Sequence, residues 1–230
     1  MKVKKGRFLF SFCMVPLLPD RSVYATVYEP REDSFLFLEA LDADRELLQS
    51  RPRSLVLEVG PGSGIVSAHL SAVLGAAQHA LFLGCDINPA AARAAHETFY
   101  RNAGQRPHLC DTLVGDLCGP LSARLRGQVD VLLFNPPYVP TDDDELGHSD
   151  LRAAWAGGAD GMAVTSRFLP LVAPLLAPDG LCYLVLERAN DPVAIARQMA
   201  ETWQLTPKRV AACTAKNERL SVWRFSHRAK

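Results

Sequence analysis

The segment from Ser54 to Gly75 most constrains the fold, because it joins an apolar run, a glycine turn and a helical pattern without a gap. SLVLEV is short and apolar enough for a buried strand, GPGSG follows at once, and IVSAHLSAVLG is typical of a helix that ends at Gly75. A strand that enters a helix through a glycine turn is the first half of a βαβ unit. The sequence therefore predicts an α/β fold with bare glycine backbone at the carboxyl end of a strand.

The same alternation of apolar runs and helical patterns continues along the chain. Further strands are expected at 80–86, 109–114, 129–134 and 180–187, and helices at 32–49, 88–102 and 166–180. Asn88 and Pro89 suit the N-cap and the first helical position. Strands that alternate with helices need right-handed crossovers, so the pattern predicts a mostly parallel sheet with helices on both faces.

The C-terminal segment departs from this rhythm. PKRVAAC at 207–213 and RLSVWRF at 219–225 are separated only by a short polar turn, and strands joined so tightly must pair antiparallel. An α/β sheet that ends in an antiparallel pair is a narrower class than a plain dinucleotide-binding fold.

Length and composition indicate one domain in a reducing compartment. The chain has 230 residues, of which 48% are hydrophobic, which suits a single well-buried domain over 24–230. It has 25 basic and 25 acidic residues, so no net positive charge draws it to nucleic acid. Six cysteines without a CxxC pair suggest neither a disulfide framework nor a metal site.

Residues 1–23 are expected to form an N-terminal extension that is loose or only partly packed. KVKKGR and FLFSFCMVPLL imitate the basic and apolar regions of a secretory signal, but no small-x-small cleavage site follows them. About 11 apolar residues are too few to span a bilayer, which needs about 20. Met14 is a second candidate for the start of translation.

The glycine turn and an acidic residue one βαβ unit later point to a nucleoside cofactor. Gly60, Gly62 and Gly64 bring bare backbone to the mouth of the sheet. Asp86, at the end of the second strand, can accept both hydroxyl protons of a ribose. The spacing G-x-G-x-G, with Glu58 two residues ahead, differs from the G-x-G-x-x-G of a pyrophosphate site. This difference favours S-adenosylmethionine (SAM) over a dinucleotide.

The tripeptide GDL after the third strand supplies a third candidate contact. Asp116 is placed to bind the adenine amino group, while Leu117 would pack on the ring. Judged alone, Asp116 is equally well an exposed loop residue. Ligands of open α/β sheets bind at the carboxyl ends of the strands, so three successive strand ends with nucleoside contacts strengthen the cofactor interpretation.

The sequence FNPPY at 134–138 follows the fourth strand directly. Pro137 holds Pro136 extended, so the Asn135 side-chain oxygen and the Pro136 carbonyl form two fixed acceptors beside the aromatic face of Tyr138. Such a site matches a planar NH2 group. Holding both N–H bonds orients the nitrogen for methyl transfer and stabilises its developing positive charge, without a strong base. A glutamine amide and the N6 amine of adenine both satisfy this description.

With these residues in place, the chain resembles the HemK family of SAM-dependent protein glutamine N5-methyltransferases, in its short archaeal and eukaryotic branch. The resemblance runs from about Tyr24 to Phe225 and rests on VYEPREDSFLFLEAL, LEVGPGSGIVSAHL, CDINPAAARAA, GDL, VDVLLFNPPYVPT and AAWAGGADG. It implies a class I methyltransferase fold with strand order 3-2-1-4-5-7-6. It also implies methylation of the glutamine amide in the GGQ tripeptide of a class I translation release factor.

The resemblance also implies roles for individual residues. The lid over SAM would comprise Tyr28, Glu29, Pro30, Asp33 and Ser34, where close relatives carry Thr at the last position. The rest of the cofactor site would comprise Glu58, Gly60, Gly62, Gly64, Asp86, Ile87, Asp116, Leu117 and Asn135. In the 156–161 loop, AGGADG, Gly157 and Gly158 would let a flat GGQ strand approach, and Trp155 would border that channel.

Members of this branch work with a small zinc-binding activator protein. In the implied strand order the third strand is an edge, and 109–114 is apolar enough to need cover. The resemblance therefore implies a heterodimer through Leu109 to Val114, in the cytoplasm and also in the nucleus.

Other acceptors and other functions remain open on the sequence alone. N6-adenine methylation would use the same two acceptors, but such an enzyme must also extract its base and grip phosphates. Protein lysine, as in histones, is a third acceptor, although a tetrahedral ammonium suits the planar site poorly. A SAM-binding scaffold would be expected to have lost Asn135 or Asp86, and a nicotinamide oxidoreductase would bind NAD instead.

Overall fold

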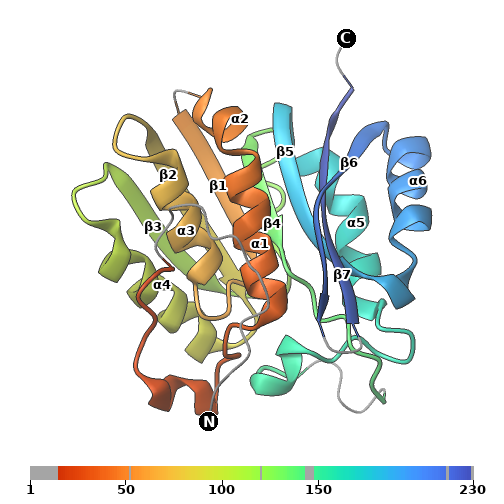
Figure 1. Ribbon diagram of the computed structural model, residues 1–230, viewed down its shortest axis with the longest axis horizontal. Helices are drawn as coiled ribbons and strands as arrows, with labels where there is room; N and C mark the ends of the chain where they lie inside the picture. The colour runs from red at the N-terminus through yellow and green to blue at the C-terminus, as the bar shows by residue number, and fades with distance from the viewer. Residues whose placement is uncertain (1–14, 52, 120, 143–147, 216–217, 229–230) are drawn as a thin grey trace.

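The computed structural model describes residues 15–51, 53–119, 121–142, 148–215 and 218–228. Seven strands form one sheet in the order β3-β2-β1-β4-β5-β7-β6 (Figure 1). The strands are β1 Arg53–Val59, β2 His79–Asp86, β3 His108–Val114, β4 Val129–Phe134, β5 Leu176–Glu187, β6 Leu205–Ala215 and β7 Glu218–His227. The α-helices are α1 Glu32–Ala43, α2 Arg45–Gln49, α3 Ile65–Leu74, α4 Pro89–Ala103, α5 Ala163–Leu175 and α6 Pro192–Thr202.

The pairing of the strands confirms the predicted class I methyltransferase fold. Strands β1 to β5 pair in parallel, whereas β7 runs antiparallel to both β5 and β6. The carboxyl ends of the five parallel strands therefore meet at one end of the sheet, where the candidate site residues were expected.

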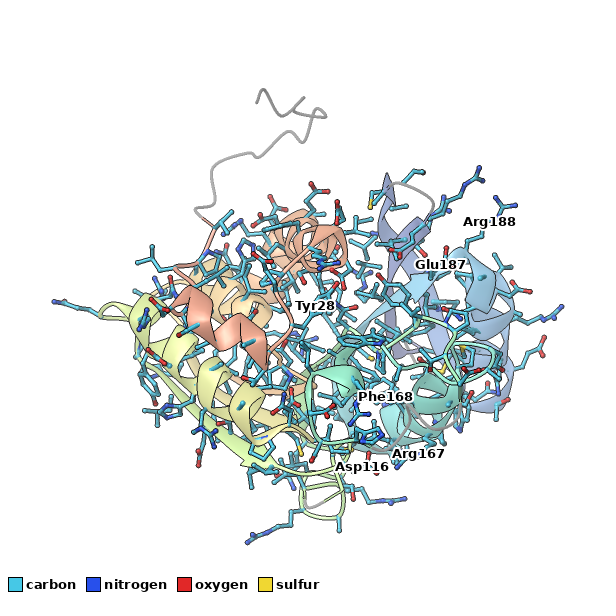
Figure 2. All side chains as sticks on the ribbon, turned by 90° about the horizontal axis from the view of Figure 1, so that it is seen from below. Tyr28, Asp116, Arg167, Phe168, Glu187 and Arg188 are labelled. Atoms are coloured by element: carbon cyan, nitrogen blue, oxygen red, sulfur yellow. The ribbon has the colours of Figure 1, made fainter. Side chains whose placement is uncertain are left out.

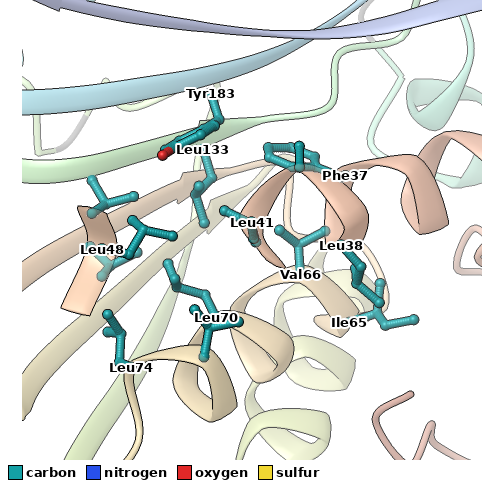
Figure 3. Packing of buried hydrophobic residues seen from close by; sticks show 14 of the residues in the cluster. Phe37, Leu38, Leu41, Leu48, Ile65, Val66, Leu70, Leu74, Leu133 and Tyr183 are labelled. Atoms are coloured by element: carbon teal, nitrogen blue, oxygen red, sulfur yellow. The ribbon is translucent and has the colours of Figure 1, made fainter. Parts of the chain in front are cut away.

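Two apolar layers enclose the sheet. Helices α1, α3 and α4 cover one face, and α5 and α6 cover the other (Figure 1). In the first layer, Phe37 and Leu41 of α1 and Leu70 of α3 pack with Leu133 of β4 (Figure 3). Because both faces of the central strands are buried, their sequences are nearly continuous apolar runs.

The expected single helix over 32–49 is wrong, because the chain breaks at Asp44 into α1 and α2. Asp44 is buried, and its Oδ2 accepts hydrogen bonds from the Tyr183 hydroxyl at 3.0 Å and the Arg224 guanidinium at 2.6 Å. These partners on β5 and β7 lie far away in the sequence. A local helical pattern therefore could not reveal the break.

Two other boundaries differ from the sequence prediction. Helix α5 covers 163–175 rather than 166–180, and β5 begins at Leu176, since Ala177 precedes Pro178 and a residue before proline disfavours helix. Helix α6 was not predicted, although Asp191 caps it through Ala194 N and Pro192 is its first residue.

The first fourteen residues of the expected extension, including Met14, lie outside the described residues. The remainder of it packs on the domain: both backbone groups of Leu17 bond to the Asn102 side chain on α4, at 2.7 and 2.9 Å. Of the helices that the structure describes, none combines the length and apolar character needed to cross a bilayer.

Candidate active site

The glycine turn after β1 is a tight backbone cradle. Gly60, Gly62 and Gly64 all have positive φ angles, of 59°, 53° and 79°. The Gly60 N–H donates to the Cys85 carbonyl at 2.8 Å, which ties the turn to β2. A Cβ on Gly64 would lie 2.6 Å from the Ala95 Cα on α4. The third glycine therefore permits close packing of two helices, while the first two leave backbone facing the cavity.

Asp86 lies at the end of β2 and fixes the same turn. Its Oδ2 accepts from Gly62 N at 3.0 Å and its Oδ1 accepts from Asn88 N at 2.9 Å. Burial raises the pKa of this carboxyl, and the two N–H donors partly offset that rise. Each oxygen keeps a further lone pair, with which Asp86 could accept the hydroxyl protons of a ribose.

Glu58, the last acidic residue of β1, is buried beneath the turn. Its Oε2 accepts from Ser67 N at 3.1 Å and from the Ser67 hydroxyl. Burial raises the pKa of Glu58 to about 8 despite these donors. The floor of the site therefore contains a carboxyl group that changes charge near neutral pH.

A cavity of about 300 Å³ opens at the carboxyl ends of the strands, and we call it the cofactor cavity. The predicted cofactor residues that line it are Tyr28, Asp33, Ser34, Glu58, Gly60, Gly62, Asp86, Ile87, Asp116, Leu117 and Asn135, together with Pro136 and Pro137 of the NPPY motif. Three predicted residues lie elsewhere: Gly64 packs on α4, Pro30 is buried, and Glu29 lines a second cavity.

At the far end of the cofactor cavity, Asp116 has a partner that the sequence did not reveal. The guanidinium of Arg167 on α5 forms an ion pair with the Asp116 carboxylate, and both side chains are about half exposed. Figure 2 shows this pair side by side, away from Tyr28. Leu117 has a φ of 51° and lines the same end. Arg167 could not be singled out, because a lone Arg on a predicted helix carries no motif.

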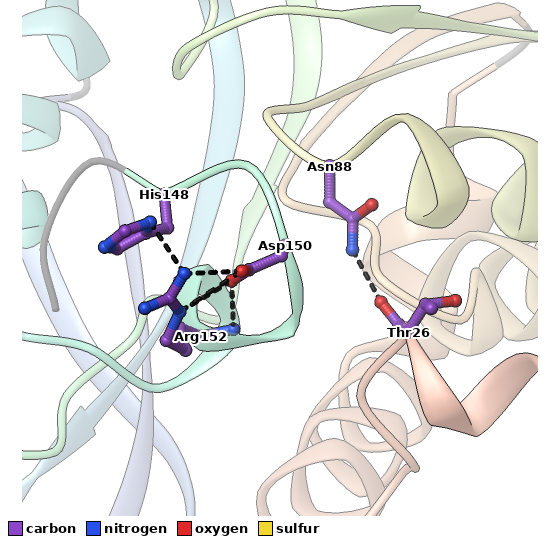
Figure 4. A network of polar contacts seen from close by, with 5 residues as sticks. All are labelled: Thr26, Asn88, His148, Asp150 and Arg152. Atoms are coloured by element: carbon purple, nitrogen blue, oxygen red, sulfur yellow. Dashed lines mark hydrogen bonds and ion pairs between the residues drawn. The ribbon is translucent and has the colours of Figure 1, made fainter.

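Polar contacts hold the chain on either side of the cofactor cavity (Figure 4). The Asn88 amide donates to the Thr26 carbonyl at 2.7 Å, which ties the segment before Tyr28 to the start of α4. On the other side, Arg152 contacts Asp150 at 2.7 Å and His148 Nδ1 at 2.8 Å. Asp150 and His148 line the cavity, and neither was predicted.

The NPPY motif lies between the cofactor cavity and the N-terminal segment. The Asn135 amide nitrogen donates to Asp33 Oδ2 at 2.9 Å. The Asn135 Oδ1 atom is buried and has no hydrogen-bond partner among the described residues. An unpaired buried acceptor costs about 1–3 kcal/mol, and such atoms in native proteins call for an explanation. An incoming N–H donor supplies one.

Tyr138 points away from the cofactor cavity and lines a second cavity of about 580 Å³, which we call the acceptor cavity. Its hydroxyl donates to Glu218 Oε2 of β7 at 3.1 Å. The lining residues are Val27, Tyr28, Glu29, Arg31, Glu32, Asp33, Tyr138, Val139, Leu151, Trp155, Ala215 and Glu218. Tyr28 and Asp33 line both cavities.

The glycines of the 156–161 loop lie in a different environment from the one expected. Gly157 and Gly158 are buried and pair with the segment after NPPY: Gly157 N donates to the Val139 carbonyl at 2.8 Å, and Thr141 N to the Gly158 carbonyl at 3.0 Å. A Cβ on Gly161 would lie 2.3 Å from the Tyr138 carbonyl. These glycines therefore allow two backbone segments to pack, and neither Gly157 nor Gly158 lines either cavity.

The residues of the cofactor cavity fit SAM. Bare glycine backbone, the spare lone pairs of Asp86, the apolar side chain of Leu117 and the carboxylate of Asp116 match a nucleoside. Within the described ranges, His, Cys, Asp and Glu side chains form no group that could hold a metal ion.

Comparisons with known proteins agree with this interpretation, although no family model matches the chain. It is 44% identical to methyltransferase HEMK2 of Mus musculus over 206 residues, which are 90% of this chain and 92% of that protein. It is 35% identical to the eRF1 methyltransferase catalytic subunit mtq2 of Schizosaccharomyces pombe over 173 residues, 73% of this chain and 75% of that one.

Solved structures support the fold. A chain of the E. cuniculi Mtq2–Trm112 complex aligns with a TM-score of 0.59 at 22% identity, covering 88% of this chain and 99% of that one. The T. thermophilus 16S rRNA N2 G1207 methyltransferase, solved with AdoMet, aligns with a TM-score of 0.60 at 19% identity. The alignment covers 87% of this chain and 44% of that one. With relatives this similar over most of its length, the chain belongs to the HemK-type family of SAM-dependent protein glutamine N5-methyltransferases.

Proposed function

We propose that this chain is the catalytic subunit of an enzyme that methylates the glutamine amide nitrogen in the GGQ tripeptide of a class I release factor. The observation that carries the proposal is the Asn135 amide, which lines the cofactor cavity, is held by Asp33 and keeps its oxygen unpaired. The relatives with printed activities point to the same acceptor, since one is an eRF1 methyltransferase subunit and others are release factor glutamine methyltransferases.

SAM supplies a methyl group activated by a positively charged sulfur. The protein's own part is to position the acceptor: Asn135 Oδ1 and the Pro136 carbonyl would each accept one N–H of the amide. Together they aim the nitrogen and stabilise the positive charge that it gains. Tyr138, fixed by Glu218, forms one wall of the path by which the acceptor arrives. The excess proton then leaves to water.

The charges of the acceptor cavity disfavour nucleic acid as the substrate. Four carboxylates line it, from Glu29, Glu32, Asp33 and Glu218, and Arg31 is the single basic residue of the lining. A nucleic acid would bring phosphates against this negative surface, whereas nucleic-acid enzymes normally neutralise phosphates with Lys and Arg. A peptide acceptor avoids that repulsion.

The β3 edge is where we place the small zinc-binding activator. Leu109 of β3 is 65% exposed, and Leu81, which pairs with it from β2 and lies on the same face, is 41% exposed. Val114, at the end of β3, is 56% exposed on the opposite face. The described part of the 115–128 connection, which follows β3, consists of bends and turns, and it leaves Leu109 and Leu81 exposed. Large exposed apolar patches mark interaction sites.

The backbone of this edge already has one local partner. The Tyr100 hydroxyl donates to the Cys110 carbonyl and accepts from Cys110 N, both at 3.1 Å. A partner strand that added to β3 would have to displace this hydroxyl, whereas a partner that contacts only side chains would leave it in place. We place the protein in the cytoplasm, where its proposed substrate, a translation factor, acts, with the nucleus as a second compartment.

Methyl transfer from labelled SAM tests the proposed function. A release factor with GGQ should be labelled, and its GGA variant should not. Asn135→Ala should lower transfer by about 100-fold, since it removes one of two hydrogen bonds made to the reacting group. Labelling of GGA would contradict the glutamine assignment, and full transfer by Asn135→Ala would contradict the role of the motif.

The activator site has its own test. Leu109→Glu should abolish co-purification of the activator and raise the yield of the free chain, because it places a charge in the apolar patch. Val193→Glu is the matched control: Val193 is 70% exposed on α6, on the other half of the sheet. Retention of the activator by Leu109→Glu would contradict the β3 edge as its site.

A further inference from the structure

Asp33 joins the two cavities and touches the NPPY motif. It lies in the first turn of α1, is 5% exposed and lines both the cofactor and the acceptor cavity. Its hydrogen bond to Asn135 spans 102 positions of the sequence. Helix capping alone does not explain why a buried carboxylate lies beside Asn135 and lines both cavities.

Each oxygen of Asp33 accepts a hydrogen bond from a different part of the chain. Oδ1 accepts from Ser34 N at 2.7 Å and lies 3.3 Å from the Ser34 hydroxyl. Oδ2 accepts from the Asn135 amide nitrogen at 2.9 Å. A carboxylate can accept at both oxygens, whereas an amide side chain has one acceptor and one donor end.

The orientation of the Asn135 amide decides whether the motif can bind an NH2 group. With its nitrogen on Asp33, Asn135 keeps its oxygen for the acceptor. If the amide turned over, its NH2 would face the acceptor NH2, donor against donor, and its oxygen would face the Asp33 oxygen, acceptor against acceptor. We propose that Asp33 is a positioning residue that holds Asn135 with its oxygen toward the acceptor nitrogen. This inference rests on the proposed function.

A neutral isostere cannot replace Asp33 in this role. In Asp33→Asn, the side-chain oxygen would remain on the Ser34 N–H, since the opposite orientation sets two donors together. The new NH2 would then face Asn135 and turn its amide over. We therefore expect Asp33→Asn to lower kcat, measured at saturating SAM, by about 30-fold, the size of one mispaired buried polar contact.

Exchanging the two side chains should restore the arrangement. In Asp33→Asn with Asn135→Asp, the Asn at 33 accepts from Ser34 N and donates to one oxygen of the Asp at 135, whose second oxygen faces the acceptor. Asn135→Asp alone places two carboxylates together, and their repulsion should abolish activity at pH 8. We expect the double variant to exceed both single variants by about tenfold in kcat.

Binding of a release factor with GGE in place of GGQ supplies a readout that does not depend on turnover. The wild-type site offers two acceptor oxygens and should reject the glutamate carboxylate. In Asp33→Asn the overturned amide would offer an NH2, so GGE binding should tighten by about tenfold relative to GGQ. The exchanged double variant should again reject GGE. A merely structural role for Asp33 predicts neither the gain nor its reversal.

The control variant is Asp42→Asn, which makes the same chemical change on the same helix. Asp42 pairs with Arg45, away from both cavities, so turnover and GGE rejection should be unchanged. The inference is overturned if Asp33→Asn retains kcat within threefold of wild type. It is also overturned if the double variant does not exceed Asn135→Asp, a comparison that holds even if Asp33→Asn alone fails to fold. Absence of GGQ methylation by the wild-type enzyme would instead contradict the proposed function.

Discussion

The cofactor cavity and the acceptor cavity lie side by side but are built in different ways. The cofactor cavity takes its walls largely from the ends of β1, β2, β3 and β4, which the sheet holds in register. The acceptor cavity is assembled from residues 27–33, 138–139 and 151–155 and the β6–β7 hairpin. The first is therefore a property of the fold, whereas the second depends on a few contacts between distant segments.

Gly64→Ala should do the greatest damage, because it attacks the fold beneath the cofactor cavity. The new Cβ would lie 2.6 Å from Ala95 backbone at a φ of 79°, and we expect a loss of about 4 kcal/mol in the free energy of unfolding from clash and strain. Gly127→Ala is the control, since φ is 69° there and nothing lies within 4 Å. Urea denaturation should show that it loses about 1–2 kcal/mol. Equal losses would mean that helix packing does not explain Gly64.

The pH dependence of stability should come next in size, and it also belongs to the cofactor side. The pKa of Glu58 is about 8 in the folded chain against 4.5 for an ordinary Glu, so the folded state binds more protons between these values. The stability that this protonated group contributes should be fully present below pH 4.5 and should fall by about 4 kcal/mol as the pH rises to 8.

Glu58→Gln tests this source of the pH dependence, because it keeps an acceptor for Ser67 without a titrating group. Melting curves of wild type and variant should converge toward acid and diverge toward pH 8. A wild-type melting temperature that does not fall relative to the variant between pH 5 and pH 8 would show that Glu58 is not a buried titrating group.

Asp86→Ala should separate the two cavities by function rather than by fold. Loss of the carboxylate would remove the proposed ribose contacts and free two backbone N–H groups, so SAM affinity should drop by about 30-fold, or about 2 kcal/mol. Release factor binding, measured without turnover, should stay within about twofold. An equal loss of both affinities would mean that the cavities are not independent.

The cofactor cavity could be predicted from the sequence more completely than the acceptor cavity. The turn at Gly60 and Gly62 and the strand that ends at Asp86 are local patterns, and the structure places them together because parallel strands share one end. The partner of Tyr138 is Glu218, 80 positions away, and the partner of Asp116 is Arg167, 51 positions away. Periodicity and turn chemistry report neighbours in sequence, so contacts that depend on tertiary packing were missed.

The smallest effect should come from the acceptor side, at the hydrogen bond between Tyr138 and Glu218. Tyr138→Phe keeps the aromatic wall and removes the hydroxyl, so KM for the release factor should rise about fivefold, near 1 kcal/mol, with SAM affinity unchanged. Glu218→Gln retains an acceptor and should raise KM less. A double-mutant cycle isolates the contact: if the hairpin fixes Tyr138 through this bond alone, Glu218→Gln should add nothing once Tyr138 is Phe. Additive effects would instead indicate that Glu218 contacts the release factor directly. The shape of the acceptor cavity would then depend on side-chain packing rather than on this hydrogen bond, as the shape of the cofactor cavity depends on the packed sheet.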